Sequence, residues 1–143
     1  MARRAPLVAG GGGLALLASL WTPWFTGRLS SGFGLLSLRR VESGWDVLGG
    51  TAGAVVALVA VLGLAWAIRP AGPLSGSWMV AAASLALVIT VEATSSRLGA
   101  DSSVPITYLP AWGLLVAYAG GATVLLAGVA ALVAYARERS KSA

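Results

Sequence analysis

Long stretches without a single charged side chain are the feature that most limits how this chain can fold. Only 10% of its 143 residues are charged, and these leave four long uncharged gaps. The gaps are 5–27, 47–68, 70–91 and 102–136. Each exceeds the roughly 20 residues that an α-helix needs to cross about 30 Å of hydrocarbon. The sequence therefore predicts an all-α fold, a polytopic membrane four-helix bundle.

Residues that interrupt helices set the expected ends of the spans. Pro23 ends the first span, because proline lacks an N–H donor and disfavours helical angles in the preceding residue. The segment 35–41 satisfies neither the strand nor the helix period, so a strand and a short interfacial helix are both open for it. We expect one membrane domain over 1–143, with spans at 6–22, 47–68, 77–97 and 109–136, and outer loops at 23–46 and 98–108.

The first span has an alternative interpretation as a secretory signal. Arg3 and Arg4 precede an apolar run, as in the basic and apolar regions of a signal peptide. Signal cleavage requires a small-x-small motif just after that run, but the large residues Leu20 and Trp21 occupy those positions. A retained first helix is therefore the favoured interpretation.

The distribution of basic residues indicates the orientation of the chain. Short cytoplasmic segments of membrane proteins are enriched in lysine and arginine. With the N-terminus inside, the inner bases are Arg3, Arg4, Arg69, Arg137, Arg139 and Lys141, and the outer ones are Arg28, Arg39, Arg40 and Arg97. We therefore expect both termini in the cytoplasm. The net charge of +5 does not indicate nucleic-acid binding, because the bases form no stripe.

The chain contains no cysteine and no histidine. It therefore has no thiol nucleophile, no imidazole base and neither of the usual haem or zinc ligands. A serine triad would lack its base. We predict no enzymatic activity, no catalytic residue, no cofactor and no metal site.

Small residues recur at four-residue spacing in two of the spans. Such stripes let a neighbouring helix approach closely. Both stripes are predicted to form helix-packing faces. Together they provide more close-packing surface than a single tight helical hairpin needs. The two stripes are Gly49, Gly53 and Ala57, and Gly113, Ala117 and Gly121.

Glu92 is the one ionisable residue placed well within a predicted span. A charged side chain at the centre of a bilayer costs about 2.5–3.5 kcal/mol on insertion scales, so an acid there has a functional interpretation by default. That interpretation is a carboxylate that binds a proton or a cation. The simpler one, which we favour, is an interfacial acid paired with Arg97 or a loop arginine.

Aromatic and charged side chains gather where both predicted outer loops emerge. Apolar walls with a few polar groups suit a small amphiphile or a lipid headgroup. The alternatives are an ordinary aromatic belt and, for Asp46, a helix cap. The candidate site consists of Trp24, Trp45, Asp46, Glu92, Arg97 and Tyr108.

Three short motifs carry a resemblance to a family. They are Trp-Thr-Pro-Trp-Phe at 21–25, Ser-Gly-Trp-Asp at 43–46 and Pro-Ala-Trp-Gly-Leu-Leu at 110–115. With them the chain resembles small four-span membrane proteins of actinobacteria, although Thr22 stands where leucine is usual. The resemblance implies a location in the bacterial plasma membrane, and it implies no activity.

These observations favour a non-enzymatic membrane protein that acts by association. We expect an accessory or scaffold subunit that uses its helix-packing faces and its outer loop. Its expected partners are membrane lipid and either another membrane protein or a second copy of the chain. The alternative is a small transporter, or a lipid- or amphiphile-binding protein, that uses Glu92 as its membrane acid.

Overall fold

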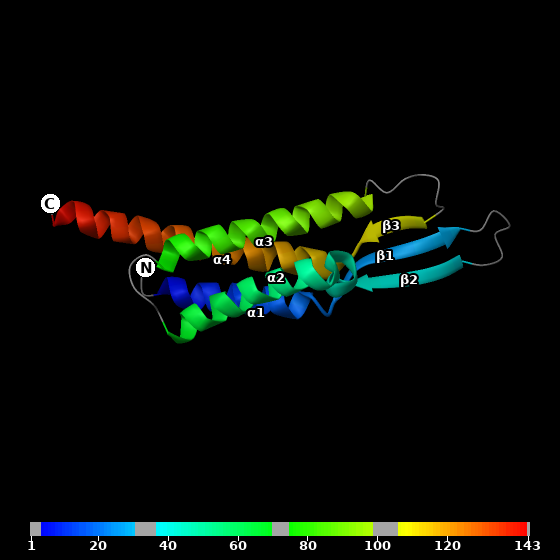
Figure 1. The fold of residues 1–143 in the computed structure, drawn as a ribbon, viewed down its shortest axis with the longest axis horizontal. Helices are drawn as coiled ribbons and strands as arrows, with labels where there is room; N and C mark the ends of the chain where they lie inside the picture. The colour runs from blue at the N-terminus through cyan, green and yellow to red at the C-terminus, as the bar shows by residue number, and fades with distance from the viewer. Residues whose placement is uncertain (1–3, 31–36, 70–74, 99–105, 143) are drawn as a thin grey trace.

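Four antiparallel helices lie side by side, and a three-stranded sheet extends from one end of them (Figure 1). The computed structural model describes residues 4–30, 37–69, 75–98 and 106–142. In chain order the elements are α1 (Ala5–Ser19), β1 (Pro23–Ser30), β2 (Ser37–Ser43), α2 (Gly44–Ile68), α3 (Ser75–Leu98), β3 (Ile106–Pro110) and α4 (Trp112–Lys141). Helix α1 begins and α4 ends at the other end of the bundle, where the last turns of α4 project beyond the start of α1 (Figure 1). We call the two ends the sheet end and the terminus end.

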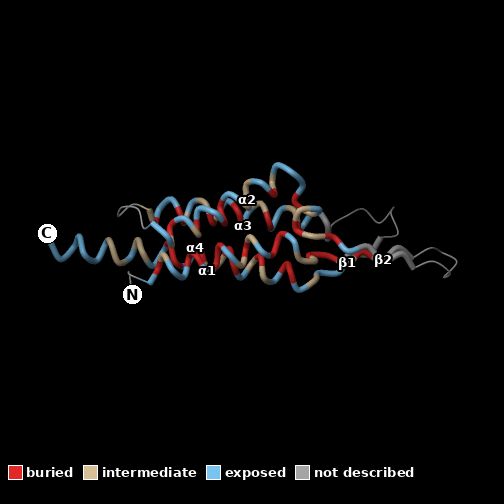
Figure 2. Tube along the Cα trace, turned by 90° about the horizontal axis from the view of Figure 1, so that it is seen from below, coloured by how far each residue is buried: buried red, intermediate tan, exposed pale blue. Residues whose placement is uncertain are grey.

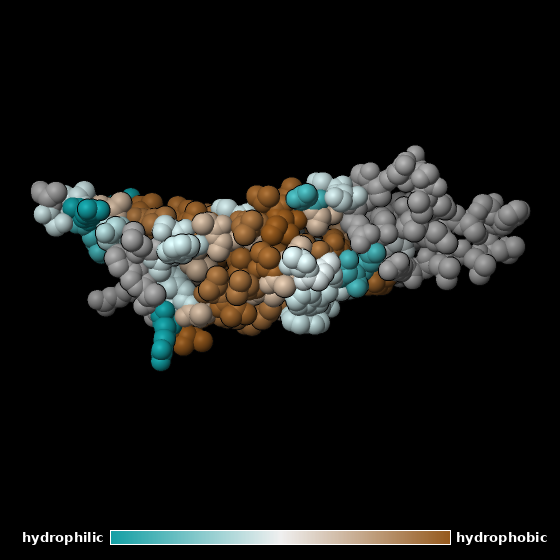
Figure 3. Space-filling model, in the orientation of Figure 1, coloured by the Kyte–Doolittle hydropathy of each residue, from teal (hydrophilic) through white to brown (hydrophobic). Residues whose placement is uncertain are grey.

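Three of the described helices are long and apolar enough to cross a membrane. They are α2, α3 and α4, and Figure 3 shows the apolar band that crosses the middle of the bundle. The first helix is shorter than the predicted span 6–22, since α1 has only 15 residues. At 1.5 Å per residue it covers about 22 Å. The other predicted spans differ from α2, α3 and α4 by a few residues at their ends.

The three strands correct the all-α prediction. Strand β1 lies in the middle and pairs antiparallel with β2 on one side and β3 on the other. Strands β1 and β2 occupy most of the predicted outer loop 23–46, whereas β3 covers only the end of the predicted loop 98–108 and the first two residues of the predicted span 109–136. Strand β2 assigns 37–41 of the open segment 35–41 to a strand, and residues 35 and 36 lie outside the described residues. Aromatic and β-branched residues favour this conformation in β1 and β3. Neither strand alternates cleanly, so the sequence showed no strand period.

The shortest helix holds a central place in the bundle. Helix α1 packs along both α2 and α4, whereas α3 packs mainly against α4 and less closely against α2. Buried residues line the inner faces of all four helices (Figure 2). Each helix therefore has an outer face of exposed apolar side chains, which suits a surrounding of lipid.

Glycines in α1 allow backbone contact with two neighbouring helices. A Cβ atom added to Gly12 would lie 2.8 Å from the carbonyl oxygen of Gly120 in α4. One added to Gly13 would lie 2.6 Å from the carbonyl oxygen of Ala60 in α2. A Cβ on Gly11 would meet nothing within 4 Å. The glycine run is thus the seam that joins α1 to both partners.

The predicted stripe on α2 does not form a helix-packing face. Gly49 has a φ angle of 77°, which interrupts the helix with a kink. Gly53 is covered by the indole of Trp45 from its own helix, at 2.5 Å from an added Cβ. Ala57 is half-buried against the core. The flat face expected from four-residue spacing is therefore broken at its first position and occupied at its second.

The predicted stripe on α4 is used inside the molecule. Gly113 packs against Thr22 and the carbonyl oxygen of Pro23 where the chain enters β1, and Gly121 packs against Leu87 of α3. Ala117 lies buried in the core between them. These small residues therefore do not leave a free face for another protein.

Candidate functional site

The junction between sheet and helices is built around Trp24 and Phe25 of β1. Both side chains are fully buried and pack with Leu16 and Leu20 from the end of α1. The indole Nε1 of Trp24 donates a hydrogen bond of 2.8 Å to the carbonyl oxygen of Ser19. Its polar edge is thus satisfied inside the protein. Trp24 anchors the sheet to the bundle and is not accessible to a ligand.

A capping box starts α2 directly after β2. The backbone N–H of Ser43 donates to Asp46 Oδ2 at 2.9 Å, and the N–H of Asp46 donates to Ser43 Oγ at 3.4 Å. Two backbone donors are satisfied reciprocally, as this motif requires. The helix-cap interpretation of Asp46 is thus confirmed, although Ser43 is the cap residue and Asp46 lies three positions later.

Trp45 closes the junction from the side of α2. Its backbone N–H donates to the carbonyl oxygen of Leu20 at 3.2 Å, which ties the start of α2 to the end of α1. Its ring meets Trp21 edge-on, with 5.6 Å between the ring centroids. Trp21 itself is 64% exposed. This pair forms an accessible aromatic surface at the junction, and Trp112 at the start of α4 is also exposed.

Glu92 lies apart from this junction, on the exposed surface of α3. Among the described side chains, none forms an ion pair with it. The predicted pairing with Arg97 and the predicted contribution of Tyr108 concern side chains outside the described ones. The structure therefore brings Trp24, Trp45 and Asp46 together around the start of α2, and it places Glu92 on another helix.

Polar groups within the bundle are bonded to one another. Thr90 and Thr94 are buried in α3, and their hydroxyls donate to the carbonyl oxygens of Ala86 and Thr90, at 2.8 and 2.7 Å. The hydroxyl of Tyr118 in α4 donates to Thr94 Oγ1 at 3.1 Å. These bonds link α3 to α4. No group of three or more metal-ligating side chains gathers in the described parts of the chain.

Sequence reasoning did not predict the burial of Glu42. This residue pairs with Phe25 across β1 and β2 and is only 2% exposed, whereas its neighbour Val41 is 53% exposed. Burial of a carboxylate is costly unless other groups compensate its charge. A charged residue beside an exposed valine is the reverse of the usual alternation, so no sequence pattern indicated its burial.

Two strands of the sheet have an edge that no other described strand covers. In the strand order β2-β1-β3, these are the outer edges of β2 and β3. The N–H of Ala111 donates to the carbonyl oxygen of Trp24 at 2.7 Å. In an antiparallel pair, bonded and non-bonded positions alternate. The register therefore turns the backbone N–H and C=O groups of Ile106 and Tyr108 away from β1.

The two edges differ in charge. Strand β2 carries Arg39, Arg40 and Glu42, and charged residues on an edge strand discourage pairing with another chain. Strand β3 reads Ile-Thr-Tyr-Leu-Pro and carries no charge. Its edge is short, uncharged and rich in residues that favour strands. The edge of β3 is therefore the better template for an additional strand.

Comparison with known proteins assigns no family and no function to this chain. The chain matches no family model, no curated protein and no solved structure. A function is therefore inferred from the structure itself, and the surface that best supports one is the uncharged edge of β3.

Proposed function

We propose that this protein is a non-enzymatic accessory or scaffold subunit of a membrane assembly. It docks a partner by adding an extended segment of that partner to the edge of β3. The observation that carries this proposal is the outward-facing backbone of Ile106 and Tyr108 on a strand without charge. Strand addition of this kind takes its affinity from main-chain hydrogen bonds.

The proposal includes a topology with four spans. Helix α1 is the fourth span, because it lies between two helices of spanning length and is buried along with them. Both termini lie in the cytoplasm and the sheet lies outside. This orientation is supported by bases near the terminus end: Arg4, Arg69, and Arg139 and Lys141 in the last turn of α4.

A partner of a different kind suits this edge better than a second copy in the same membrane. The strands run along the length of the bundle, in the same general direction as the helices (Figure 1). Two copies related by rotation about the membrane normal would present their β3 strands in parallel. Antiparallel pairs are slightly more stable per residue. An extended segment from another protein is free to run antiparallel.

The transport alternative has less support. It requires Glu92 to titrate within a cavity, yet Glu92 is exposed on α3. The buried hydroxyls of Thr90 and Thr94 bond to carbonyl oxygens of their own helix and provide no lining for a polar path. An association role requires no such path and is therefore the function that we propose.

Site-specific crosslinking tests the proposal in the native membrane. A photoreactive phenylalanine analogue is placed at position 108 on β3, and the control chain carries it at position 41 on the outer edge of β2. We expect one recurrent crosslinked product from position 108. Equal products from both positions, or none from position 108, would contradict docking along β3. A product with the mass of two copies of this chain would show self-association and refute a heterologous partner.

Proline variants then test the main-chain bonds. Tyr108→Pro removes an outward N–H from β3, and Val41→Pro removes one from the outer edge of β2. Edge strands tolerate proline at such positions. We expect Tyr108→Pro to lose the crosslinked partner in pull-down and Val41→Pro to retain it. Tryptophan fluorescence of both purified variants checks that the fold is intact. Retention of the partner by a folded Tyr108→Pro protein would refute strand addition.

A further inference from the structure

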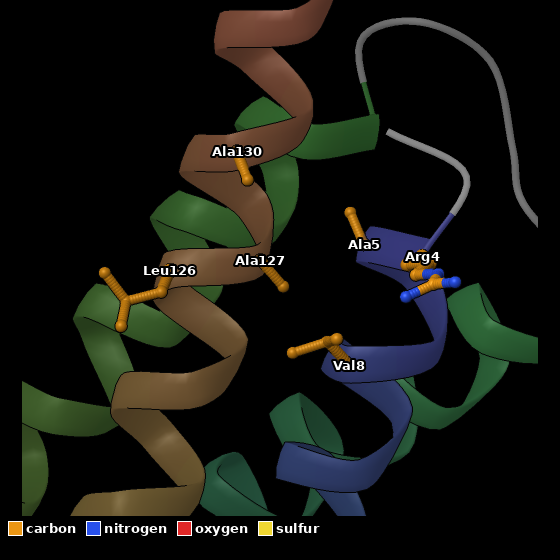
Figure 4. A pocket seen from close by; sticks show the side chains of 6 residues that line it. All are labelled: Arg4, Ala5, Val8, Leu126, Ala127 and Ala130. Atoms are coloured by element: carbon orange, nitrogen blue, oxygen red, sulfur yellow. The ribbon is translucent and has the colours of Figure 1, made fainter. Parts of the chain in front are cut away.

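An open groove of about 480 Å³ lies between α1 and α4 at the terminus end. Five of its six lining residues are apolar, and the sixth is Arg4 (Figure 4). The lining residues are Arg4, Ala5, Val8, Leu126, Ala127 and Ala130. The groove is thus an apolar trough with one cation at its end.

Short side chains produce this groove. Ala5, Ala127 and Ala130 face the space where α1 begins beside α4, and none of them fills it. Val8 and Leu126 border the groove and are 48% and 67% exposed. Leu126 lies on α4, which is long enough to span a membrane, and the proposed topology places Val8 of α1 beside it, so both exposed side chains are expected to meet lipid. The groove is therefore open to the hydrocarbon of the leaflet on the terminus side.

Arg4 gives the groove a preference in charge. It lies one residue before α1, its side chain is exposed, and no side chain in the described ranges pairs with it. An arginine at the end of a membrane helix can extend its side chain to the headgroup layer and bind a lipid phosphate by charge-assisted hydrogen bonds. An apolar trough below a cation is complementary to an acyl chain below an anionic headgroup.

We propose that this groove is a binding site for one anionic phospholipid. Its phosphate bonds to the Arg4 guanidinium, and one acyl chain lies along Val8, Leu126 and Ala130. The site depends on insertion of the bundle in a membrane and is independent of the β3 edge. Failure of either proposal therefore leaves the other standing.

A second groove in the same molecule provides an internal comparison. It has a volume of about 410 Å³ and lies between α2 and α3. Its lining is Leu62, Trp78, Met79, Ala81, Ala82 and Leu85, without a charged residue. Acyl chains fit it as well, but nothing in the lining selects a headgroup. Lipid binding at this groove is expected to show no preference for negative charge.

Native mass spectrometry of the full-length protein in mild detergent tests the site. Phosphatidylglycerol and phosphatidylcholine with identical acyl chains are added in equal amounts. One basic residue near a membrane surface contributes about 1 kcal/mol toward an anionic lipid, which corresponds to about a fivefold preference for the first bound lipid. We expect the wild-type protein to show this preference and Arg4→Gln to lose it.

Matched variants separate the site from general attraction of anionic lipid. Arg69→Gln removes an exposed arginine at the same end and should leave the preference unchanged. Ala130→Leu fills the groove and should lower retention of the first lipid severalfold, whereas Ala119→Leu adds the same volume on the exposed surface of α4 and should not. Equal loss from Arg4→Gln and Arg69→Gln would overturn the proposal. Unchanged retention in Ala130→Leu would also overturn it.

Discussion

The glycine seam of α1 permits a sharp test, because adjacent glycines have opposite surroundings. Gly12 faces α4, where an added Cβ would lie 2.8 Å from the Gly120 carbonyl oxygen and 2.9 Å from Thr123 Cβ. A backbone carbonyl cannot move aside as a flexible side chain can. Gly12→Ala must therefore push α1 away from α4. Gly11→Ala places the same methyl group in open space.

The magnitude follows from comparing these two variants. Replacement of glycine by alanine in a helix is worth up to about 1 kcal/mol in propensity, and both variants share that gain. Their difference in the free energy of unfolding therefore isolates the clash, which for an overpacked interior is about 1–3 kcal/mol. We expect Gly12→Ala to be less stable than Gly11→Ala by this amount.

Unfolding in mixed micelles with increasing dodecyl sulfate, followed by tryptophan fluorescence, measures this difference. Gly120→Ala supplies a reciprocal check, since its Cβ would lie 2.7 Å from the Gly12 carbonyl oxygen. A single shift of α1 away from α4 would relieve both clashes. The loss of unfolding free energy in the double variant should therefore be smaller than the sum of the losses in the two single variants. Equal stability of Gly11→Ala and Gly12→Ala would refute the seam.

Three further substitutions test other parts of the fold by the same unfolding assay. Ser43→Ala removes the cap of α2 and should cost about 1 kcal/mol, and no loss would refute a stabilising cap. Trp24→Phe removes the buried hydrogen bond to a carbonyl group and should cost about 1–3 kcal/mol, while Trp21→Phe at an exposed position should cost much less. Gly49→Ala forces alanine to a positive φ and should lower the free energy of unfolding by about 1–2 kcal/mol. Gly50→Ala adds a Cβ that meets no atoms and should cause no such loss, so equal effects of the two variants would contradict the kink.

Local composition was enough to predict the helical part of the chain. Three uncharged stretches became helices of spanning length, because the transfer of a segment into hydrocarbon depends on its own residues and little on their neighbours. The role of Asp46 in starting α2 was predictable for the same reason, since a capping box involves residues three positions apart.

The sheet depended on contacts between distant segments. Phe25 pairs with Pro110 across β1 and β3, so the strand conformation of each segment required the other. Propensity for strands depends strongly on such context. Trp24 illustrates the same limit. Its aromatic ring suggested a membrane belt, but only the meeting of β1 with the end of α1 decided that it would be buried.

Helix packing was the other property that only the tertiary structure decided. Spacing of four residues identified Gly49 and Gly53, but a kink and a tryptophan ring occupy those positions. The actual seams use Gly12 and Gly13, which the sequence showed only as part of a glycine run. Spacing along one helix reports which residues share a face, whereas a seam depends on what the facing helix presents at the same height. For that physical reason the sequence by itself determined the apolar helices, and the tertiary structure decided which of their surfaces meet.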